Sequence, residues 1–211
     1  MIREIALESY SVAQRAVKAG VERIELNQRL DLGGLTPQRA TWQKIQKLKV
    51  PVVVMVRPRG GDFNYNNDEL NQMKATLRQL KADRIQSVTF GVLNANQTLN
   101  KSVMKELIEL AAPMEVVMHM AFDAIPQNDQ VDSMQWLSQN HVHRILMHGG
   151  ALSEPLSDTV SHLKALVKAA KQLKEPMIIL PGGGVTTDNI KQLYQQLGVT
   201  QFHGSRIIKL D

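Results

Sequence analysis

The chain contains no cysteine among its 211 residues. Disulfide bonds and thiolate metal sites are therefore both excluded. No stretch reaches the roughly 18 consecutive apolar residues that a membrane-spanning helix requires. The first residues, Met1–Glu4, also lack the apolar run of a signal peptide. We therefore expect a cytoplasmic protein that does not associate with a membrane.

Aromatic residues are scarce, at 4% of the chain, while the formal net charge is +5. An excess of lysine and arginine can indicate nucleic-acid binding. Here the basic residues are spread along helical segments, and few aromatic side chains are present to stack on bases. We expect a solvated basic surface that is compatible with small anionic ligands, and no nucleic-acid partner.

Short β-rich runs alternate with helical patterns from end to end. Eight parallel strands joined by right-handed crossovers close a barrel. We therefore predict a compact (β/α)8 TIM barrel, a single domain over residues 1–211, in which the eighth helix is absent or a stub. The alternative, an open doubly wound sheet, typically carries a G-x-G-x-x-G loop after its first strand, and this chain has none there. The predicted strands are Arg3–Glu8, Arg23–Asn27, Val52–Arg57, Ser87–Val92, Glu115–His119, Arg144–His148, Met177–Leu180 and Gln201–Gly204, and the predicted helices are Ser11–Ala19, Thr36–Leu48, Asp68–Ala82, Lys101–Leu110, Gln130–Asn140, Leu156–Leu173 and Thr187–Leu197.

Capping residues support several of these helix ends. Ser9 or Ser11 can accept hydrogen bonds from the first turn of the first helix, and Gly20 stands where a glycine commonly ends a helix. Thr36-Pro37 and Thr187-Asp188 are expected to open the second and seventh helices in the same way.

The alternation of side chains along each strand predicts which residues face the barrel interior. The apolar set should pack on the helices, which leaves polar residues inside, near the carboxyl ends of the strands. Active sites of such barrels lie at that end. A simpler alternative is that these groups only satisfy one another at the barrel mouth. The expected inward set is Glu8, Glu25, Arg57, His119, His148 and His203, and the same alternation turns Glu4 and Ala6 inward.

Two glycine-containing loops follow the last two strands: Pro181-Gly182-Gly183-Gly184 and His203-Gly204-Ser205-Arg206. Loops at these positions commonly form a phosphate site, because glycines let backbone amides approach an anion closely. We predict that the loops bind an anion, although tight turns without a ligand would have the same composition. The predicted anion-binding residues are Gly182, Gly183, Gly184, Gly204 and Ser205.

The string Arg57-Pro58-Arg59-Gly60-Gly61-Asp62-Phe63 ends the third strand. Arginine forms bidentate hydrogen bonds with carboxylates and phosphates. Arg57 and Arg59 are therefore candidates for orienting an anionic substrate. The alternative is an arginine–Asp62 latch that closes the barrel mouth.

His119 and Asp123 follow the fifth strand within one loop and can form an oriented acid–base pair. Glu25 can partner His119 across the barrel, or it can pair with Arg57 on the neighbouring strand. The candidate catalytic residues are thus Glu25, His119 and Asp123.

These strings together resemble the CutC family. The resemblance lies in Arg23-Ile24-Glu25-Leu26, Gly33-Gly34-Leu35-Thr36-Pro37, Val56 to Phe63, Gly91-Val92-Leu93, Ala121-Phe122-Asp123 and His203-Gly204-Ser205. It covers essentially the whole chain and implies a cytoplasmic barrel linked to copper homeostasis. It also implies a homo-oligomer, which we expect to be a dimer or a tetramer.

The chain departs from the family pattern at positions that bear on copper, which the resemblance alone implies as a cofactor. Family members often carry cysteine on the first two strands, where this chain has Ala6, Leu7 and Asn27. Met120 replaces an arginine of the family string, and Met147-His148 replaces a threonine-serine pair.

Cu(I) prefers soft thiolate or thioether ligands. Strand alternation turns Met118 and Met147 toward the helices and the neighbouring histidines toward the interior, so one copper site cannot easily use both sets. The remaining metal candidate is a three-histidine site made of His119, His148 and His203.

The sequence thus leaves two functions open. One is a CutC-like role in copper homeostasis with an anion-binding site at the strand ends. The other is a TIM-barrel enzyme that acts on a small phosphorylated or carboxylated metabolite by acid–base chemistry.

Overall fold

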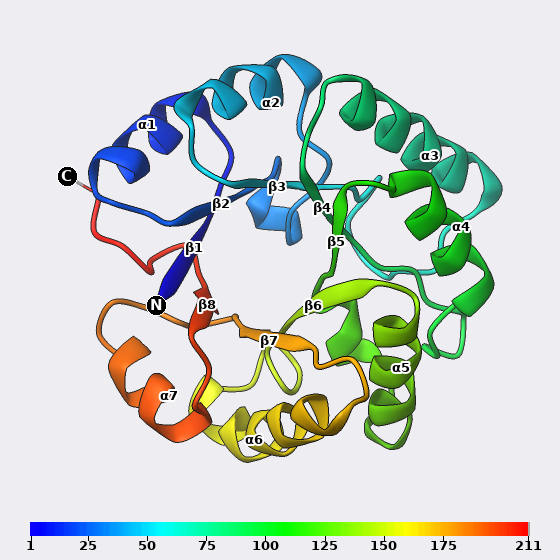
Figure 1. The fold of residues 1–211 in the computed structure, drawn as a ribbon, viewed down its shortest axis with the longest axis vertical. Helices are drawn as coiled ribbons and strands as arrows, with labels where there is room; N and C mark the ends of the chain where they lie inside the picture. The colour runs from blue at the N-terminus through cyan, green and yellow to red at the C-terminus, as the bar shows by residue number, and fades with distance from the viewer. Residues whose placement is uncertain (211) are drawn as a thin grey trace.

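A computed structural model describes residues 1–210, and it confirms the predicted barrel of parallel strands and surrounding helices (Figure 1). All eight strands belong to one sheet, in the order β7-β6-β5-β4-β3-β2-β1-β8. The strands are β1 Ile2–Leu7, β2 Arg23–Leu26, β3 Val52–Met55, β4 Ser87–Phe90, β5 Glu115–Met118, β6 Val142–Met147, β7 Ile178–Pro181 and β8 Gln201–His203. Each lies at a predicted position, and the ends differ by a few residues.

The barrel closes by packing at one seam. β7 and β8 lie side by side, but no hydrogen-bonded ladder joins them in the described part of the chain. A single parallel bridge between Thr186 and Arg206 links the loops beyond the two strands. A Cβ atom at Gly204 would lie 2.4 Å from the Val185 carbonyl oxygen, so only glycine permits this close approach. The seam therefore brings together the two loops predicted to bind an anion.

Helices cover the outside of the sheet, and short 3₁₀ turns occur at Leu30–Leu32, Gln46–Leu48 and Met120–Ala124. The first helix is capped as predicted: the Ser9 hydroxyl accepts a hydrogen bond from the Val12 amide, and Gly20 has a left-handed backbone with φ +80°. The helices are α1 Tyr10–Lys18, α2 Arg39–Ile45, α3 Asn67–Ala82, α4 Lys101–Ala111, α5 Gln127–Gln139, α6 Leu156–Gln172 and α7 Ile190–Leu197.

Two predicted helix starts are wrong. Gln38 is the N-terminal cap of α2, and Asn189 is that of α7, so neither Thr36-Pro37 nor Thr187-Asp188 opens a helix. The Thr36 hydroxyl instead accepts a hydrogen bond from the Arg57 amide at 2.8 Å and donates one to the Arg57 carbonyl at 3.0 Å. This tertiary contact competes with capping and holds the segment after β2 against the end of β3.

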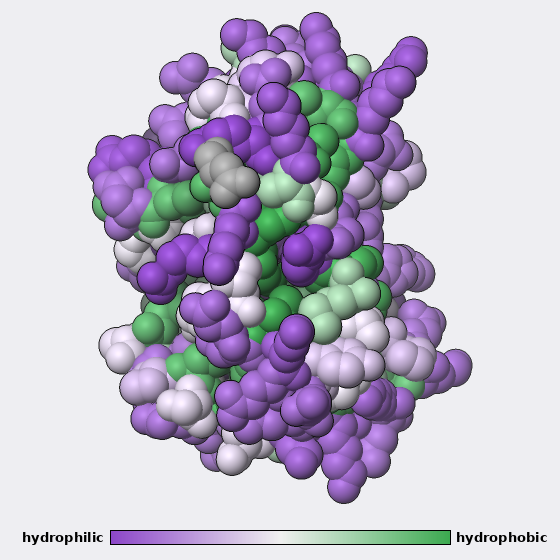
Figure 2. All heavy atoms as spheres, turned by 90° about the vertical axis from the view of Figure 1, so that its left-hand side faces the viewer, coloured by the Kyte–Doolittle hydropathy of each residue, from purple (hydrophilic) through white to green (hydrophobic). Residues whose placement is uncertain are grey.

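No helix follows β8 within residues 204–210. The segment passes between α7 and α1 (Figure 1), and it buries Ile207 and Ile208 where an eighth helix would otherwise pack. Figure 2 shows this face with a band of hydrophobic atoms between polar flanks. The expectation of an absent or reduced eighth helix is therefore confirmed for the described residues.

Strand alternation correctly predicts the inner layer of the barrel. Val53, Val117 and Leu146 share strand faces with the predicted inward residues Arg57, His119 and His148. With Leu180 they form a small cluster that is separate from the core between sheet and helices. Met118 and Met147 lie in that outer core, again as expected. Among residues 1–210, no helix combines the length and the apolar character needed to cross a membrane.

The Thr36 contact gives a test of how the mouth loops are held. The change Thr36→Val preserves shape but removes both hydrogen bonds between the Thr36 hydroxyl and the Arg57 backbone. We therefore expect the free energy of unfolding to fall by about 1–3 kcal/mol in urea denaturation. Thr76→Val is the matched control, because the Thr76 hydroxyl bonds only to the Gln72 carbonyl of its own helix. Equal losses in the two variants would show that the contact contributes nothing specific.

Candidate functional site

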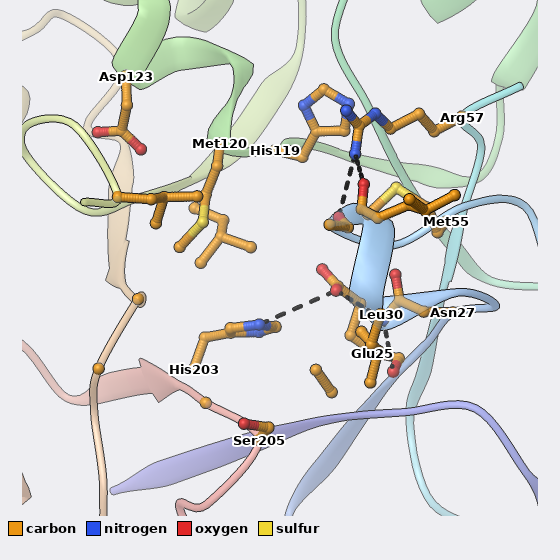
Figure 3. Close-up of a pocket in the computed structure, with 18 of the residues that line it drawn as sticks. Glu25, Asn27, Leu30, Met55, Arg57, His119, Met120, Asp123, His203 and Ser205 are labelled. Carbon is orange, nitrogen blue, oxygen red and sulfur yellow. Dashed lines mark hydrogen bonds and ion pairs between the residues drawn. The ribbon is translucent and has the colours of Figure 1, made fainter. Parts of the chain in front are cut away.

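A cavity of about 810 Å³ opens at the carboxyl ends of the strands. It brings together residues from all eight strands or from the loops that follow them, and Figure 3 shows part of this wall. The predicted site residues that line it are Glu25, Arg57, His119, Asp123, Gly183, Gly184, Gly204 and Ser205, together with His203.

Gly182, Arg59 and Glu8 do not line the cavity, and the Gly182 amide donates to the Met147 carbonyl at 2.9 Å. The Arg59 guanidinium donates to Glu69 at 2.6 Å and to Asp62 at 2.9 Å. This corresponds to the arginine–Asp62 latch considered for the string, with Arg59 as its arginine. Glu8, expected to face inward, is exposed beyond the end of β1 and accepts a hydrogen bond from the Leu30 amide at 2.7 Å.

His148 is buried but is absent from the cavity wall. Its Nδ1 lies 3.2 Å from the carbonyl oxygen of Gly182, and its Nε2 lies 3.1 Å from that of Glu154. The ring therefore lies between the loops after β6 and β7, and as a neutral imidazole it can donate to one of the two carbonyls. The structure does not bring His148 together with His119 and His203 as a metal site.

Arg57 uses most of its donors to hold loops. Its Nη1 donates to the Leu32, Gly33 and Gly34 carbonyls, and its Nη2 donates to the Gly61 carbonyl at 2.8 Å. The guanidinium also stacks over the Phe63 ring at 4.8 Å from its centroid. Its buried Nε has no partner. Arg57 is thus a structural clamp that retains one unsatisfied donor and an unpaired positive charge.

His119 and Asp123 lie in one loop but do not bind each other. The Asp123 carboxylate accepts hydrogen bonds from the amides of His148 and Gly149, at 2.8 and 2.7 Å. Burial raises the pKa of Asp123 to about 6, against the effect of these amides. The predicted acid–base pair is therefore not formed.

The His119 ring is neutral and has a defined tautomer. Its Nδ1 accepts a hydrogen bond from the Ala121 amide at 3.1 Å, so the ring proton resides on Nε2. Burial and the nearby Arg57 charge lower the pKa of His119 to about 3. In this tautomer Nε2 is a donor rather than an acceptor, and it is buried without a hydrogen-bond partner.

The histidine that does pair with a carboxylate is His203. Its Nδ1 lies 2.8 Å from Glu4 Oε1, while the other Glu4 oxygen accepts a hydrogen bond from Arg23 Nε. Burial alone would raise the pKa of Glu4, but the bond and charge of His203, with Arg23, outweigh it and lower the pKa to about 2. Burial likewise opposes the charging of His203, yet Glu25 and Glu4 raise its pKa above the ordinary value.

Glu25 completes this group from β2. One oxygen, Oε1, accepts a hydrogen bond from Asn27 Nδ2 at 3.0 Å and lies 3.9 Å from His203 Nε2 (Figure 3). The other oxygen is buried without a partner. Burial raises the pKa of Glu25, and the negative charge of Glu4 adds to this, while the positive charge of His203 acts against it. Glu25 contacts neither His119 nor Arg57 by a hydrogen bond within the described residues.

The glycine loops form one side of the cavity. Gly183 and Gly184 have left-handed backbones, with φ +71° and +105°. In the described chain, the amides of Gly183, Gly184 and Ser205 donate to no backbone acceptor. The exposed Arg206 side chain also lines the cavity and forms no ion pair with another described residue. Arg206 was not among the predicted anion-binding residues, although its position directly after Gly204-Ser205 in the sequence could have indicated it.

Unsatisfied buried polar atoms are concentrated in this cavity. Of eight such side-chain atoms in residues 1–210, four belong to residues of its wall. Each unsatisfied group costs free energy that a bound polar molecule can recover. The four atoms are two acceptors, Glu25 Oε2 and Asn27 Oδ1, and two donors, Arg57 Nε and His119 Nε2.

The pairing of Glu4 with His203 can be tested by titration. Because the Glu4 carboxylate favours the charged imidazolium, we expect the pKa of His203 to lie above 6.5 and to fall in Glu4→Gln. The contribution of His203 to stability is then present below pH 6.5 and lost as the pH rises through the folded-state pKa. NMR titration of the imidazole nitrogens measures the pKa of His203 in each variant. Glu22→Gln, which removes a carboxylate paired with Arg3, should leave His203 unchanged; an equal pKa in wild type and Glu4→Gln would contradict the assignment.

Comparison with known proteins places this geometry in a family. The model of the CutC family matches residues 1–208. A CutC family protein of Enterococcus faecalis is 35% identical over 212 aligned positions, covering 99% of this chain and 100% of that protein. The human copper homeostasis protein cutC homolog is 32% identical over 205 positions, covering 97% of this chain and 72% of its own length.

Solved structures agree with this. The crystal structure of the CutC protein from Streptococcus agalactiae superposes with a TM-score of 0.92 at 34% identity, covering 98% of this chain and 99% of that one. A phosphonopyruvate hydrolase, at 14% identity and a TM-score of 0.65, shares the fold alone. The chain belongs to the CutC family.

Proposed function

We propose that this CutC-family chain binds a small anionic molecule that carries hydroxyl or carbonyl groups, in the cavity at the carboxyl ends of its strands. We further propose that it acts in copper homeostasis, the role in the names of the human and mouse relatives, through that molecule. The observation that carries the proposal is the concentration of unsatisfied polar atoms on this one cavity wall.

The anionic end of the ligand is assigned to the loops after β7 and β8. The amides of Gly183, Gly184 and Ser205 donate to no backbone acceptor in the described chain, and these residues line the cavity together with Arg206. Backbone amides beside glycines and an arginine are the groups that bind phosphate and carboxylate in proteins. No carboxylate pairs with Arg206 in the described chain, so its charge is available to an anion.

The polar end of the ligand is assigned to the opposite wall. Glu25 and Asn27 offer acceptors there, and Arg57 and His119 offer donors. A hydroxyl group can satisfy an acceptor, whereas a carbonyl oxygen can satisfy a donor. A bare inorganic anion would leave these atoms unsatisfied, which favours an organic ligand.

The donor set does not fit a resident copper ion. The chain has no thiolate, and the thioethers of Met55 and Met120 lie on different sides of the cavity (Figure 3). In residues 1–210, Glu4, Glu25 and His203 are the one group of acidic and imidazole side chains close enough to share a metal. Glu4, however, already accepts from Arg23 and His203 and does not line the cavity. Copper therefore lacks both soft ligands and a complete set of hard ones.

The cytoplasmic location and the homo-oligomeric state, dimer or tetramer, stay predictions from the family resemblance.

Phosphate binding tests the anionic end. Isothermal titration calorimetry with inorganic phosphate should show binding that weakens roughly tenfold in Arg206→Gln, because one charge-assisted hydrogen bond is lost. Arg78→Gln is the matched control: it makes the same change in net charge on the exposed side of α3. Absence of phosphate binding by the wild type, or equal weakening in both variants, would contradict the assignment of the anionic end.

Copper binding tests the other half of the proposal. Equilibrium dialysis against Cu(I) should give less than one bound equivalent at micromolar free copper, because the cavity offers no cluster of soft ligands. A Met120→Leu variant, which removes the thioether nearest the glycine loop, should behave like the wild type. Stoichiometric, Met120-dependent binding at micromolar affinity would show that copper itself is the ligand.

A further inference from the structure

We propose that Glu25 and His203 act together as a proton-transfer pair on a carbonyl compound that carries a phosphate or carboxylate group. The inference rests on the proposed function, because it assumes that the cavity holds such an anion. It keeps Glu25 from the catalytic residues that the sequence predicted, and it replaces His119 and Asp123 by His203.

The His203 ring is held with one nitrogen fixed and the other presented to the cavity. Nδ1 is bound to Glu4 at 2.8 Å, beneath the cavity, and Arg23 fixes the second Glu4 oxygen. Nε2 therefore points toward the ligand space, where its nearest charged group is Glu25 Oε1 at 3.9 Å. Glu4 acts as a positioning residue, which is the arrangement that orients a histidine used in acid–base chemistry.

Glu25 has the features of a base that awaits a substrate. Only 3% of the residue is exposed, and its Oε2 has no partner, so a proton on a bound ligand meets no competing donor there. Asn27 holds Oε1 at 3.0 Å and thereby fixes the carboxylate plane. Burial also keeps water from solvating the carboxylate, which strengthens it as a base toward a ligand inside the cavity.

The separation of the two groups selects the chemistry. His203 Nε2 and Glu25 Oε1 are 3.9 Å apart. The loop of Gly204 and Ser205, which lines the cavity, begins one residue beyond His203. A carbonyl oxygen and the hydrogen on the adjacent carbon are similarly close together within one molecule. A substrate with its anionic group at Ser205 can thus present both to the pair at once.

The proposed step is balanced without any further reactant. The Glu25 carboxylate removes the proton from the carbon next to the carbonyl, and the electron pair of that C–H bond forms a carbon–carbon double bond. The carbonyl oxygen takes the Nε2 proton of the His203 imidazolium, which yields an enol, a protonated Glu25 and a neutral His203. Return of both protons regenerates the carbonyl compound, with its carbon-bound proton exchanged for one from the solvent.

Proton–deuterium exchange provides the test. Wild-type protein is incubated in D₂O with dihydroxyacetone phosphate and, separately, with pyruvate, and loss of the carbon-bound proton signal is followed by ¹H NMR. We expect exchange of at least one probe well above the rate without protein. Both Glu25→Gln and His203→Gln should lower the rate by roughly 100-fold or more, the usual contribution of one acid–base group. The control variant Arg78→Gln should catalyse exchange of the probe's carbon-bound proton at the wild-type rate.

A second readout separates catalysis from folding. Glu25→Asp keeps a carboxylate and should retain part of the exchange that Glu25→Gln loses, while circular dichroism shows whether each variant is folded. The charged groups that face the His203 imidazole are Glu4 on β1 and Arg23 and Glu25 on β2. Glu4→Gln removes one of the two carboxylates that favour the imidazolium. We therefore expect the high-pH limb of the exchange rate profile to move to lower pH.

The outcomes are distinguishable. Binding of both probes in calorimetry without exchange overturns the proton-transfer pair and leaves the proposed anion site standing. Exchange that survives in folded Glu25→Gln and His203→Gln also overturns the pair. Failure of the wild type to bind phosphate or either probe overturns the proposed function and this inference together.

Discussion

Glu4 lies buried between Arg23 and His203, and the position of the candidate site depends on this arrangement. Its two oxygens are bound by Arg23 from β2 and by His203 from β8. Isolating a carboxylate from water costs several kcal/mol unless opposite charges and hydrogen bonds compensate. When His203 is protonated and Glu25 is ionised, the charges of Arg23, Glu4, His203 and Glu25 alternate in sign, and each buried charge then has an opposite neighbour. The chain of charges joins three adjacent strands beneath the cavity.

This chain of charges matters most at the seam of the barrel. β8 has three residues and pairs with β1 alone, because no ladder joins it to β7. The contact between His203 and Glu4 therefore supplements a short ladder in fixing where β8 ends. Gly204, Ser205 and Arg206 follow directly, so the same contact also positions one half of the proposed anion site. On the far wall, Arg57 fixes the loops by bonding to carbonyl groups.

Local patterns in the sequence predicted the strands and the inward-facing residues, but not their partners. Strand alternation placed Glu25, His119 and His203 inside, and the structure agrees. It could not show that Glu4 stands opposite His203 in the pairing of β1 with β8, because register between distant strands leaves no local signature. Thr36 was misassigned as a helix cap for a related reason: its hydroxyl bonds to Arg57, a contact between residues 21 positions apart. Arg59 lies in the same arginine-proline-arginine string as Arg57, so the sequence does not distinguish the two residues. In the structure Arg59 binds Asp62 and Glu69 and does not line the cavity.

The balance of charge supports the proposal that the cavity binds an anion rather than a metal cation. Arg23 and His203 neutralise Glu4 and face Glu25, so these carboxylates carry little uncompensated charge toward a ligand. A divalent ion beside them would meet two cations already in place, and displacing either would leave a buried charge unpaired. Arg57 and Arg206, in contrast, have no carboxylate partner among the described residues. An anion entering the cavity therefore meets uncompensated positive charge and unused amide donors, and it disturbs none of the buried ion pairs.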